Sequence, residues 1–524
     1  MSEANMLTPE MTHGSTLAGF IRTAMRRWPD REALVGGGVR WTYAELGAEA
    51  NRFARYFRNC GLKRGDAVAL LSGNTSAVIA ATQAVQILGL RYTPLHPMGS
   101  EDDHAFVIED AGITTLMVDA DAHAVRGRTL KARMGLKRVL TFGPSDFGDD
   151  LVAGAASFDG SDVPIEAQPE DITSLNYTGG TTGRPKGVVH RHRSTVAMMT
   201  QELAFWEWPQ DVRFLVATPL SHAAGAMMTP TLVKGGTFVF LKGFDPAEYL
   251  ATIARERITA TFMVPTMLYA LLDYPGIADA DLSSLEMLIY GAAPASPARL
   301  EQAIKVFGPI LCQLYGQSEA PQTISYLAKA DHLIAGRLGS CGLPVPCNQV
   351  RLITPDGRDA DQDEPGEICF RGPTIMEGYW SRPEESAAAF RDGWLRTGDI
   401  ARRDADGYLH IVDRSKDMII TGGFNVYPRE IEDCLAQHPA VAMCAVVGVP
   451  DDKWGEAVKA VVVLKSGAMV SGEELVTAVR TAKGVHYAPK IIEFVESLPH
   501  TAVGKLDRKA IRAMSWQGQE RLVG

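Results

Sequence analysis

The sequence predicts an α/β fold, because short β-rich runs alternate with longer amphipathic runs along most of the chain. A β-rich run at 237–241 is followed by an amphipathic run at 246–256, and a β-rich run at 286–290 by an amphipathic run at 296–307. Alternation of this kind is typical of largely parallel sheets whose strands are joined by crossover helices. With 524 residues, of which 46% are hydrophobic, the chain can bury the cores of several domain-sized units.

The pattern changes near residue 364, where short strands at 367–371 and 408–412 are separated by turns rich in glycine and aspartate. We expect a smaller β-rich subdomain there. A charged run then precedes a new α+β pattern, which begins with a helix at 428–437. We therefore predict a large N-terminal domain (1–415) and a small C-terminal domain (417–524) that can move as a unit, with the boundary at Lys416.

The composition argues against several classes of protein. A net charge of -10 disfavours a general nucleic-acid binder. Seven scattered cysteines without a C-x-x-C pair indicate reduced thiols and not a structural zinc site. Residues 1–15 lack the apolar core of a signal peptide, and the apolar stretch 77–90 is shorter than the roughly 20 residues of a membrane span. We expect a cytoplasmic protein with no integral membrane span, in which 77–90 is a buried helix.

A glycine-rich segment at residues 177–188 (YTGGTTGRPKGV) follows a short strand-like run at 172–175. Its glycines free the backbone to point successive N–H groups at a ligand. The threonines add hydroxyl groups and Lys186 adds a positive charge, a combination that suits a polyphosphate. The spacing differs from the Walker pattern. A flexible surface loop is the alternative, which the threonines and the lysine disfavour.

With this segment the chain resembles the adenylate-forming enzymes, which comprise acyl-CoA synthetases, peptide-synthetase adenylation domains and luciferases. The resemblance extends from about residue 16 to about residue 512, and Gly179 departs from it, because serine is commoner there. It implies an ATP-dependent ligase that forms an acyl-adenylate and then an acyl-CoA thioester, with AMP and pyrophosphate as products. Further elements resemble the family in its order, at 291–294, 315–319, 397–399, 413–417, 421–428 and 499–505.

The resemblance implies catalytic roles for individual residues. Glu319 would hold the Mg²⁺ that neutralises the departing pyrophosphate, and Lys186 would contact the triphosphate. Lys505 would meet the carboxylate and the α-phosphate, where a fixed cation stabilises the charge of the transition state. Lys416 would be the hinge about which the C-terminal domain swings. Outside the family, Glu319 and Lys505 would be interpreted as solvated surface charges.

The resemblance also implies which residues bind the nucleotide and CoA. Tyr315 would stack on adenine, Asp399 would accept hydrogen bonds from the ribose hydroxyls, and Arg414 would contact the ribose or a phosphate. Gly422 and Gly423 would shape the passage for the CoA thiol. The complete predicted set is Thr178, Gly179, Gly180, Thr181, Thr182, Gly183, Gly291, Ala292, Ala293, Tyr315, Gly316, Ser318, Asp399, Arg414, Gly422 and Gly423.

The segment 219–225 (PLSHAAG) lies where the family places an element of the acid pocket. His222 would shield the pocket or contact the carboxylate, and a structural histidine is the alternative. No aspartate stands there to pair with an ammonium group, which favours an acid other than an amino acid. The candidate pocket residues carry no permanent charge, so the tail should be neutral and apolar, either fatty or aromatic. They are His222, Ala226, Met227, Gly291, Ala292, Gly316 and Pro321.

Two rival functions remain open at the sequence level. A stand-alone adenylating enzyme would load an acyl carrier protein instead of CoA. A nonenzymatic nucleotide-binding descendant of the family is disfavoured, because Lys186, Glu319, Asp399 and Lys505 occur together. A homodimer is compatible with the resemblance. Residues 190–193 (HRHR) suggest a metal or nucleic-acid site, but we expect them to open a helix with partly solvated charges.

Overall fold

The computed structural model describes residues 16–178, 184–221, 223–414, 417–421, 424–451, 454–499 and 506–513. A nine-stranded sheet carries the middle of the chain, and its central strands β1, β11, β10, β12, β13 and β14 run parallel. The antiparallel strands β2, β15 and β16 form its edges. In spatial order the strands are β16 (Leu343–Pro344), β15 (Ala320–Leu327), β14 (Leu311–Gln317), β13 (Met287–Gly291), β12 (Ala260–Met263), β10 (Arg213–Val216), β11 (Thr237–Phe240), β1 (Glu32–Gly36) and β2 (Val39–Thr42).

An eight-stranded sheet is built mainly from the N-terminal part of the chain. Its strands from β8 to β7 are parallel, whereas β9 pairs antiparallel with β8 and β19 antiparallel with β9. The order is β19 (Gly378–Tyr379), β9 (Lys186–Arg191), β8 (Ile172–Thr178), β4 (Arg91–Pro94), β3 (Ala67–Leu71), β5 (Thr115–Asp119), β6 (Arg138–Phe142) and β7 (Asp149–Asp150). Strand β19 therefore brings a segment far along the chain to the edge of this sheet.

Helices cover these sheets as the periodicity predicts. The apolar stretch 77–90 forms the buried helix α4 (Ser76–Leu88), which begins at the N-cap Thr75 and ends at Gly89 with a φ of 63°. The helices predicted at 246–256 and 296–307 are α11 (Pro246–Arg255) and α13 (Pro297–Phe307). Within the described residues no helix is both long and apolar enough to cross a membrane.

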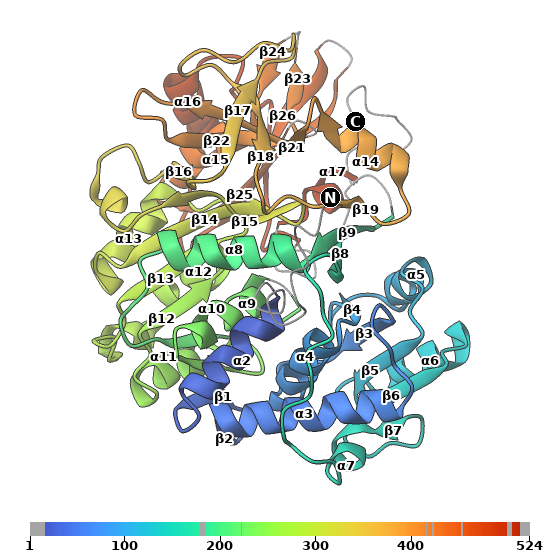
Figure 1. The fold of residues 1–524 in the computed structure, drawn as a ribbon. Coiled ribbons are helices and arrows are strands. Elements are labelled where there is room, and N and C mark those ends of the chain that lie inside the picture. The colour runs from blue at the N-terminus through green and yellow to red at the C-terminus, as the bar shows by residue number, and fades with distance from the viewer. Residues whose placement is uncertain are drawn as a thin grey trace, which may run out of the picture.

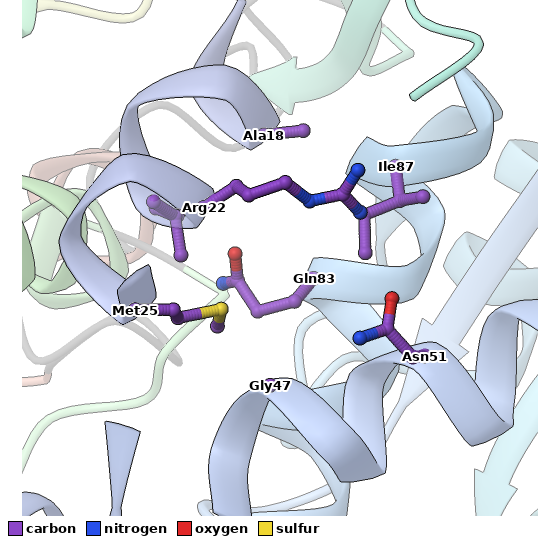
Figure 2. A pocket seen from close by; sticks show the side chains of 8 residues that line it. Ala18, Arg22, Met25, Gly47, Asn51, Gln83 and Ile87 are labelled. Atoms are coloured by element: carbon purple, nitrogen blue, oxygen red, sulfur yellow. The ribbon is translucent and has the colours of Figure 1, made fainter. Parts of the chain in front are cut away.

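A small cavity of about 10 Å³, room for about one water molecule, lies between α4, α2 (Leu17–Arg27) and α3 (Tyr43–Asn59). Figure 2 shows the guanidinium of Arg22 and the amide of Gln83 beside it. The Nη2 atom of Arg22 has no hydrogen-bond partner among the described residues. None of the predicted site residues lines this cavity, so we interpret it as a packing feature of the helices.

The remaining strands form two smaller sheets. The first is the predicted β-rich subdomain, with strands β17 (Gln349–Ile353), β18 (Gly366–Arg371), β20 (Phe390–Arg391), β21 (Trp394–Arg403) and β22 (Leu409–Arg414). The second belongs to the C-terminal part, drawn in orange to red at the top of Figure 1. It contains β23 (Ile419–Thr421), β24 (Phe424–Val426), β25 (Val441–Asp451), β26 (Gly455–Leu464) and β27 (Ile491–Phe494), with helices α15 (Pro428–Ala436), α16 (Gly472–Lys483) and α17 (Arg508–Ala513).

The predicted fold class is confirmed: a large mixed α/β part with parallel sheets and a β-rich subdomain precedes a smaller α+β part. The C-terminal part has its own core, in which Ile419, Ile431, Val446, Val458 and Leu475 are buried together. A separate core is what allows a domain to move as a unit. Residues 415 and 416 lie outside the described residues, so the boundary at Lys416 stays a prediction.

Candidate active site

The described ends of the predicted phosphate-binding segment lie in two paired antiparallel strands. Thr178 pairs with Lys186 and Tyr177 with Gly187, so both ends of the segment lie in strands β8 and β9. A side chain at Gly187 would place its Cβ 2.9 Å from the Tyr177 ring, which explains the glycine. The Tyr177 hydroxyl donates to Asp110 Oδ2 at 2.6 Å and so fixes β8 to the preceding helix α5 (Glu101–Asp110).

Lys186 lies beside a tyrosine that the sequence analysis missed. Its Nζ is 5.0 Å from the centre of the Tyr379 ring, which β19 places next to β9 by pairing Tyr379 with Val188. The Tyr379 hydroxyl donates to Glu319 Oε1 at 2.8 Å. Burial and the neighbouring Glu319 carboxylate raise the pKa of Tyr379, so the hydroxyl keeps its proton. Tyr379 therefore joins the predicted phosphate contact to the predicted Mg²⁺ ligand.

The hairpin of β14 and β15 carries the predicted residues of the 315–319 element. Tyr315 pairs with Ser325 and Gln317 with Ala320, so residues 321–324 bulge out opposite Gly316 alone. A Cβ at Gly316 would lie 2.2 Å from the backbone nitrogen of Gln322. Only glycine fits so close to another backbone.

The tip of this hairpin is held from two sides. The carbonyl of Ser318 accepts a hydrogen bond from His190 Nε2 at 2.7 Å, and the carbonyl of Glu319 accepts one from the Met376 N–H at 2.8 Å. His190 belongs to β9, so the strand that begins at Lys186 also supports the tip. The Glu319 carboxylate is thus presented from a backbone that is fixed to the neighbouring sheet.

Three predicted nucleotide contacts meet at Asp399, a buried residue of β21 that is 4% exposed. The Tyr315 hydroxyl donates to Asp399 Oδ2 at 2.7 Å, and Arg414 Nε lies 3.0 Å from Asp399 Oδ1. Burial and the Asp399 carboxylate raise the pKa of Tyr315. Each carboxylate oxygen has two acceptor positions, so Asp399 can accept further hydrogen bonds.

The Thr397-Gly398-Asp399 segment lies within β21, where the register of β21 against β18 shifts. The Thr397 hydroxyl donates to the Ile368 carbonyl at 2.7 Å and accepts from the Asp399 N–H at 3.1 Å. Gly398 has a φ of 72°, a left-handed conformation that favours glycine. This irregular part of β21 presents the Asp399 carboxylate to Tyr315 and Arg414.

The predicted small residues of the 291–294 element lie at the carboxyl end of β13. Gly291 pairs with Leu314, and a Cβ at Gly291 would meet the Leu314 carbonyl oxygen at 2.6 Å. Ala292 follows with a φ of 64°, which is unusual for a residue other than glycine. Ala293 comes next, outside the strand. Ligands of open α/β sheets bind at the carboxyl ends of parallel strands, the edge where Gly291 and Tyr315 stand.

A charged junction lies where β22 meets the C-terminal part. Asp413 accepts hydrogen bonds from the N–H groups of Arg414 at 2.6 Å and Arg429 at 3.1 Å. Burial raises the pKa of Asp413 to about 7, with Arg508 opposing the shift and Glu432 adding to it. The pair Asp413–Arg429 is thus a direct contact between the residues on either side of the predicted hinge.

The expectation about residues 190–193 is confirmed in part. Helix α8 (His192–Phe205) begins only at His192, because residues 186–191 pair as β9. The side chains of Arg191 and Arg193 are partly exposed, as expected, whereas the two histidines are buried, and burial lowers the pKa of both, that of His192 to about 4. Arg191 and Arg193 instead reach the Glu377 carboxylate at 3.0 and 2.7 Å. The neutral histidines therefore serve packing and hairpin support.

The structure brings together the predicted residues Tyr315, Asp399 and Arg414, and it links Lys186 with Glu319 through Tyr379. The other predicted residues that can be placed, Thr178, Gly291, Ala292, Ala293, Gly316 and Ser318, lie in or next to β8, β13 and β14. Several predictions lie outside the described residues, namely Gly179, Gly180, Thr181, Thr182, Gly183, His222, Lys416, Gly422, Gly423 and Lys505.

Comparison with known proteins identifies the family. The family model described as "AMP-binding enzyme" matches residues 21–380, and the "AMP-binding enzyme C-terminal domain" matches residues 430–505. The chain belongs to the AMP-binding enzyme family. The resemblance to adenylate-forming enzymes of the acyl-CoA synthetase branch is thereby confirmed.

Family members with high similarity cover nearly the full chain. A medium/long-chain-fatty-acid–CoA ligase, FadD8 of Mycobacterium tuberculosis, is 48% identical over 96% of this chain and 90% of that protein. A feruloyl-CoA synthase of an Amycolatopsis species is 40% identical over 93% and 96%. Among solved structures, the amide bond synthetase McbA from Marinactinospora thermotolerans is 36% identical, with a TM-score of 0.88 over 95% of this chain and 99% of that one.

Proposed function

We propose that this protein is an AMP-forming acid–CoA ligase that acts on a carboxylic acid with a neutral, largely apolar tail. The observation that carries the proposal is the pair of linked clusters at the β14–β15 hairpin. Tyr315 meets Asp399 on one side, and Glu319 meets Tyr379 beside Lys186 on the other. Membership of the AMP-binding family and relatives named as CoA ligases support ATP and CoA as co-substrates.

In the first half-reaction an oxygen of the substrate carboxylate attacks the α-phosphorus of ATP. The bond to the bridging oxygen of the β-phosphate breaks, and pyrophosphate leaves with the bonding electrons. The protein contributes position and charge: Lys186 at the phosphates, and Lys505 where negative charge develops on the α-phosphate. Tyr315, Asp399 and Arg414 would hold the adenosine part, because their side chains form one connected group.

The residues present fit a Mg²⁺ ion. Mg²⁺ is commonly held by one or two carboxylates together with phosphate oxygens of the substrate. Glu319 offers one carboxylate, of which the Tyr379 hydroxyl contacts only Oε1. When bound, the ion would neutralise charge on the phosphates. Tyr379 then has a positioning role, since its hydrogen bond limits the rotation of the Glu319 side chain.

In the second half-reaction the CoA sulfur attacks the acyl carbon, the bond to AMP breaks, and the thiol proton is released. We propose that the C-terminal domain swings about Lys416 between the two steps, which would remove Lys505 and bring Gly422 and Gly423 to the thiol path. The separate C-terminal core and the small polar contact at Asp413 and Arg429 are compatible with such a movement.

The names of the relatives include both a fatty and an aromatic acid, which supports a neutral tail for this protein's substrate. The described pocket candidates agree, since Ala226, Met227, Gly291 and Pro321 bear no charge. We propose that the ligase acts in the cytoplasm, where both ATP and CoA occur. Loading of a carrier protein remains the alternative acceptor reaction, and the amide bond synthetase relative adds an amine as a third acceptor to test.

The test is to incubate the purified protein with ATP, Mg²⁺ and a panel of fatty and aromatic acids, with CoA, a carrier protein or an amine as acceptor. Mass spectrometry should detect a CoA thioester with one class of acid. Lys505→Ala should abolish acyl-adenylate formation, whereas the exposed Lys509→Ala in α17 should leave it unchanged. Adenylate without thioester would identify another acceptor, and no acid-dependent pyrophosphate release with any acid would contradict the proposal.

A further inference from the structure

Gln322 has an unusual backbone position. It lies in the four-residue bulge 321–324 of β15, opposite Gly316, and its φ is 59°. A left-handed conformation is disfavoured for a residue with a side chain, and such residues gather at ligand sites where the surrounding structure enforces them. Bulges next to active sites turn side chains in a new direction. Gln322 is therefore held in a strained conformation beside a predicted site residue.

The side chain of Gln322 connects two predicted parts of the site. It is 6% exposed, and its Nε2 donates to the carbonyl of Ala223 at 3.2 Å. Ala223 is the first residue of α9 (Ala223–Ala226), directly after His222 in the predicted acid-pocket segment. Because Nε2 donates to a carbonyl, the other amide atom is an oxygen acceptor. This Oε1 is buried and has no hydrogen-bond partner in the part of the chain that the structure describes.

A buried acceptor without a donor is unfavourable, and native proteins rarely keep one without a function or a ligand. The described residues that we assign to the acid pocket offer no donor side chain, since Ala226, Met227, Gly291 and Pro321 have none. Gln322 thus offers a polar acceptor at the edge of a group of pocket residues that are otherwise apolar. Pockets of this composition use their few polar groups to fix orientation and specificity.

We propose that Gln322 is a specificity-determining residue whose Oε1 accepts a hydrogen bond from a neutral hydroxyl or amine N–H on the tail of the acid. The favoured acids would then be apolar acids that carry such a donor, rather than plain alkyl or aryl acids. This inference rests on the proposed ligase function and refines its substrate class. The amide of Gln322 lies against the predicted acid-pocket segment through its contact with Ala223, and the inference places Oε1 toward the bound acid.

The test compares matched acids that differ only in the donor: 4-hydroxycinnamate with cinnamate, 8-hydroxyoctanoate with octanoate, and 2-aminobenzoate with benzoate. We expect kcat/KM for CoA-thioester formation to favour the donor-bearing member of at least one pair by about 10-fold or more. In Gln322→Met, which keeps the length but removes the amide, this ratio should fall to about one. The loss should fall on the donor-bearing acid, and the acid without the donor should react as well as before or better.

The matched control is Gln201→Met. Gln201 is also a buried glutamine, but both ends of its amide pair with Asn348 at 3.1 Å, so its replacement should lower stability and leave the ratio unchanged. A wild-type ratio near one for all three pairs would overturn the inference without any variant. A preference that persists in Gln322→Met would overturn it as well. In both cases, thioester formation would still support the proposed ligase function. If no acid gave a thioester, both the ligase function and the inference about Gln322 would be contradicted.

Discussion

The Asp399 carboxylate should determine a large part of the enzyme's kcat/KM for ATP. Its carboxylate is 4% exposed, accepts the Tyr315 hydroxyl at 2.7 Å and lies 3.0 Å from Arg414 Nε. Asp399→Asn keeps the shape and one oxygen acceptor but removes the negative charge. Hydrogen bonds to a charged acceptor contribute about 1.5–3 kcal/mol each, and bonds to a neutral acceptor about 1 kcal/mol. If the carboxylate binds two ribose hydroxyls, the variant loses about 2 kcal/mol, or roughly 30-fold in kcat/KM for ATP.

The assay is pyrophosphate release at varied ATP with the acid saturating, together with urea unfolding of each variant. Tyr315→Phe removes only the hydroxyl that donates to the Asp399 carboxylate, so it should cost about 1.5–3 kcal/mol of stability and much less than 30-fold in kcat/KM. As a control, Asp359→Asn breaks the exposed ion pair with Arg351, whose N–O distance is 2.7 Å. It should leave both kcat/KM for ATP and the free energy of unfolding nearly unchanged.

Two results would refute this reasoning. A folded Asp399→Asn variant whose kcat/KM for ATP stays within about twofold of wild type would show that the carboxylate does not bind the nucleotide. Equal losses in Asp399→Asn and Tyr315→Phe would show that the carboxylate acts only by holding the Tyr315 ring. A loss of kcat/KM for ATP confined to a folded Asp399→Asn variant is the outcome that the geometry predicts.

Three further predictions follow from single contacts. Gly316→Ala would place a Cβ 2.2 Å from the Gln322 nitrogen, so urea unfolding should show a loss of about 1–3 kcal/mol and adenylation should fall. Tyr379→Phe frees Glu319 Oε1, and we expect about a 10-fold lower rate of pyrophosphate release that rises with added Mg²⁺; an unchanged rate would exclude the positioning role. Because the pKa of Asp413 is about 7 in the folded protein against an ordinary 3.8, the native state holds a proton that the unfolded state has lost, and its contribution to stability falls as pH rises from about 4 to 7. Asp413→Asn should flatten this fall in urea unfolding between about pH 4 and 7, and an unchanged slope would contradict the assignment.

Much of the fold could be predicted from the sequence because its strands and helices carry local patterns. The strand predicted at 237–241 is β11, which ends one residue earlier, and the helix predicted at 296–307 begins one residue later than expected. Contacts between distant segments could not be predicted in this way. Tyr379 reaches Glu319 only because the two-residue strand β19 pairs with β9, and a two-residue strand leaves no periodic signal. The bulge that turns Gln322 has the same origin, since it exists only in the pairing of β14 with β15.

The candidate site shows the same difference: its residues could be found from local motifs, whereas the contacts between them join distant segments. The residue types of Tyr315, Glu319 and Asp399 could be selected from motifs, because each motif is a short continuous run. Their partners could not, because Tyr315 and Glu319 lie four positions apart on one hairpin yet contact different sheets. Tyr315 reaches Asp399 on β21, and Glu319 reaches Tyr379 on β19.

The two sides of the predicted hinge are fixed unequally, which decides which contacts would change if the C-terminal part rotates about Lys416 as we propose. Arg414, the last described residue before Lys416, pairs with Asp399 both through the β21–β22 ladder and through its side chain. Beyond the hinge, Arg429 contacts the N-terminal part through its N–H to Asp413 at 3.1 Å and its side chain to the Ala295 carbonyl at 3.3 Å. The contacts of Arg414 with Asp399 lie within the β-rich subdomain and would survive a rotation about Lys416, whereas its carbonyl also accepts the N–H groups of Asp417 and Met418 beyond the hinge. The Arg429 contacts cross the hinge and must break, so the arrangement around the nucleotide would persist while the C-terminal part moves.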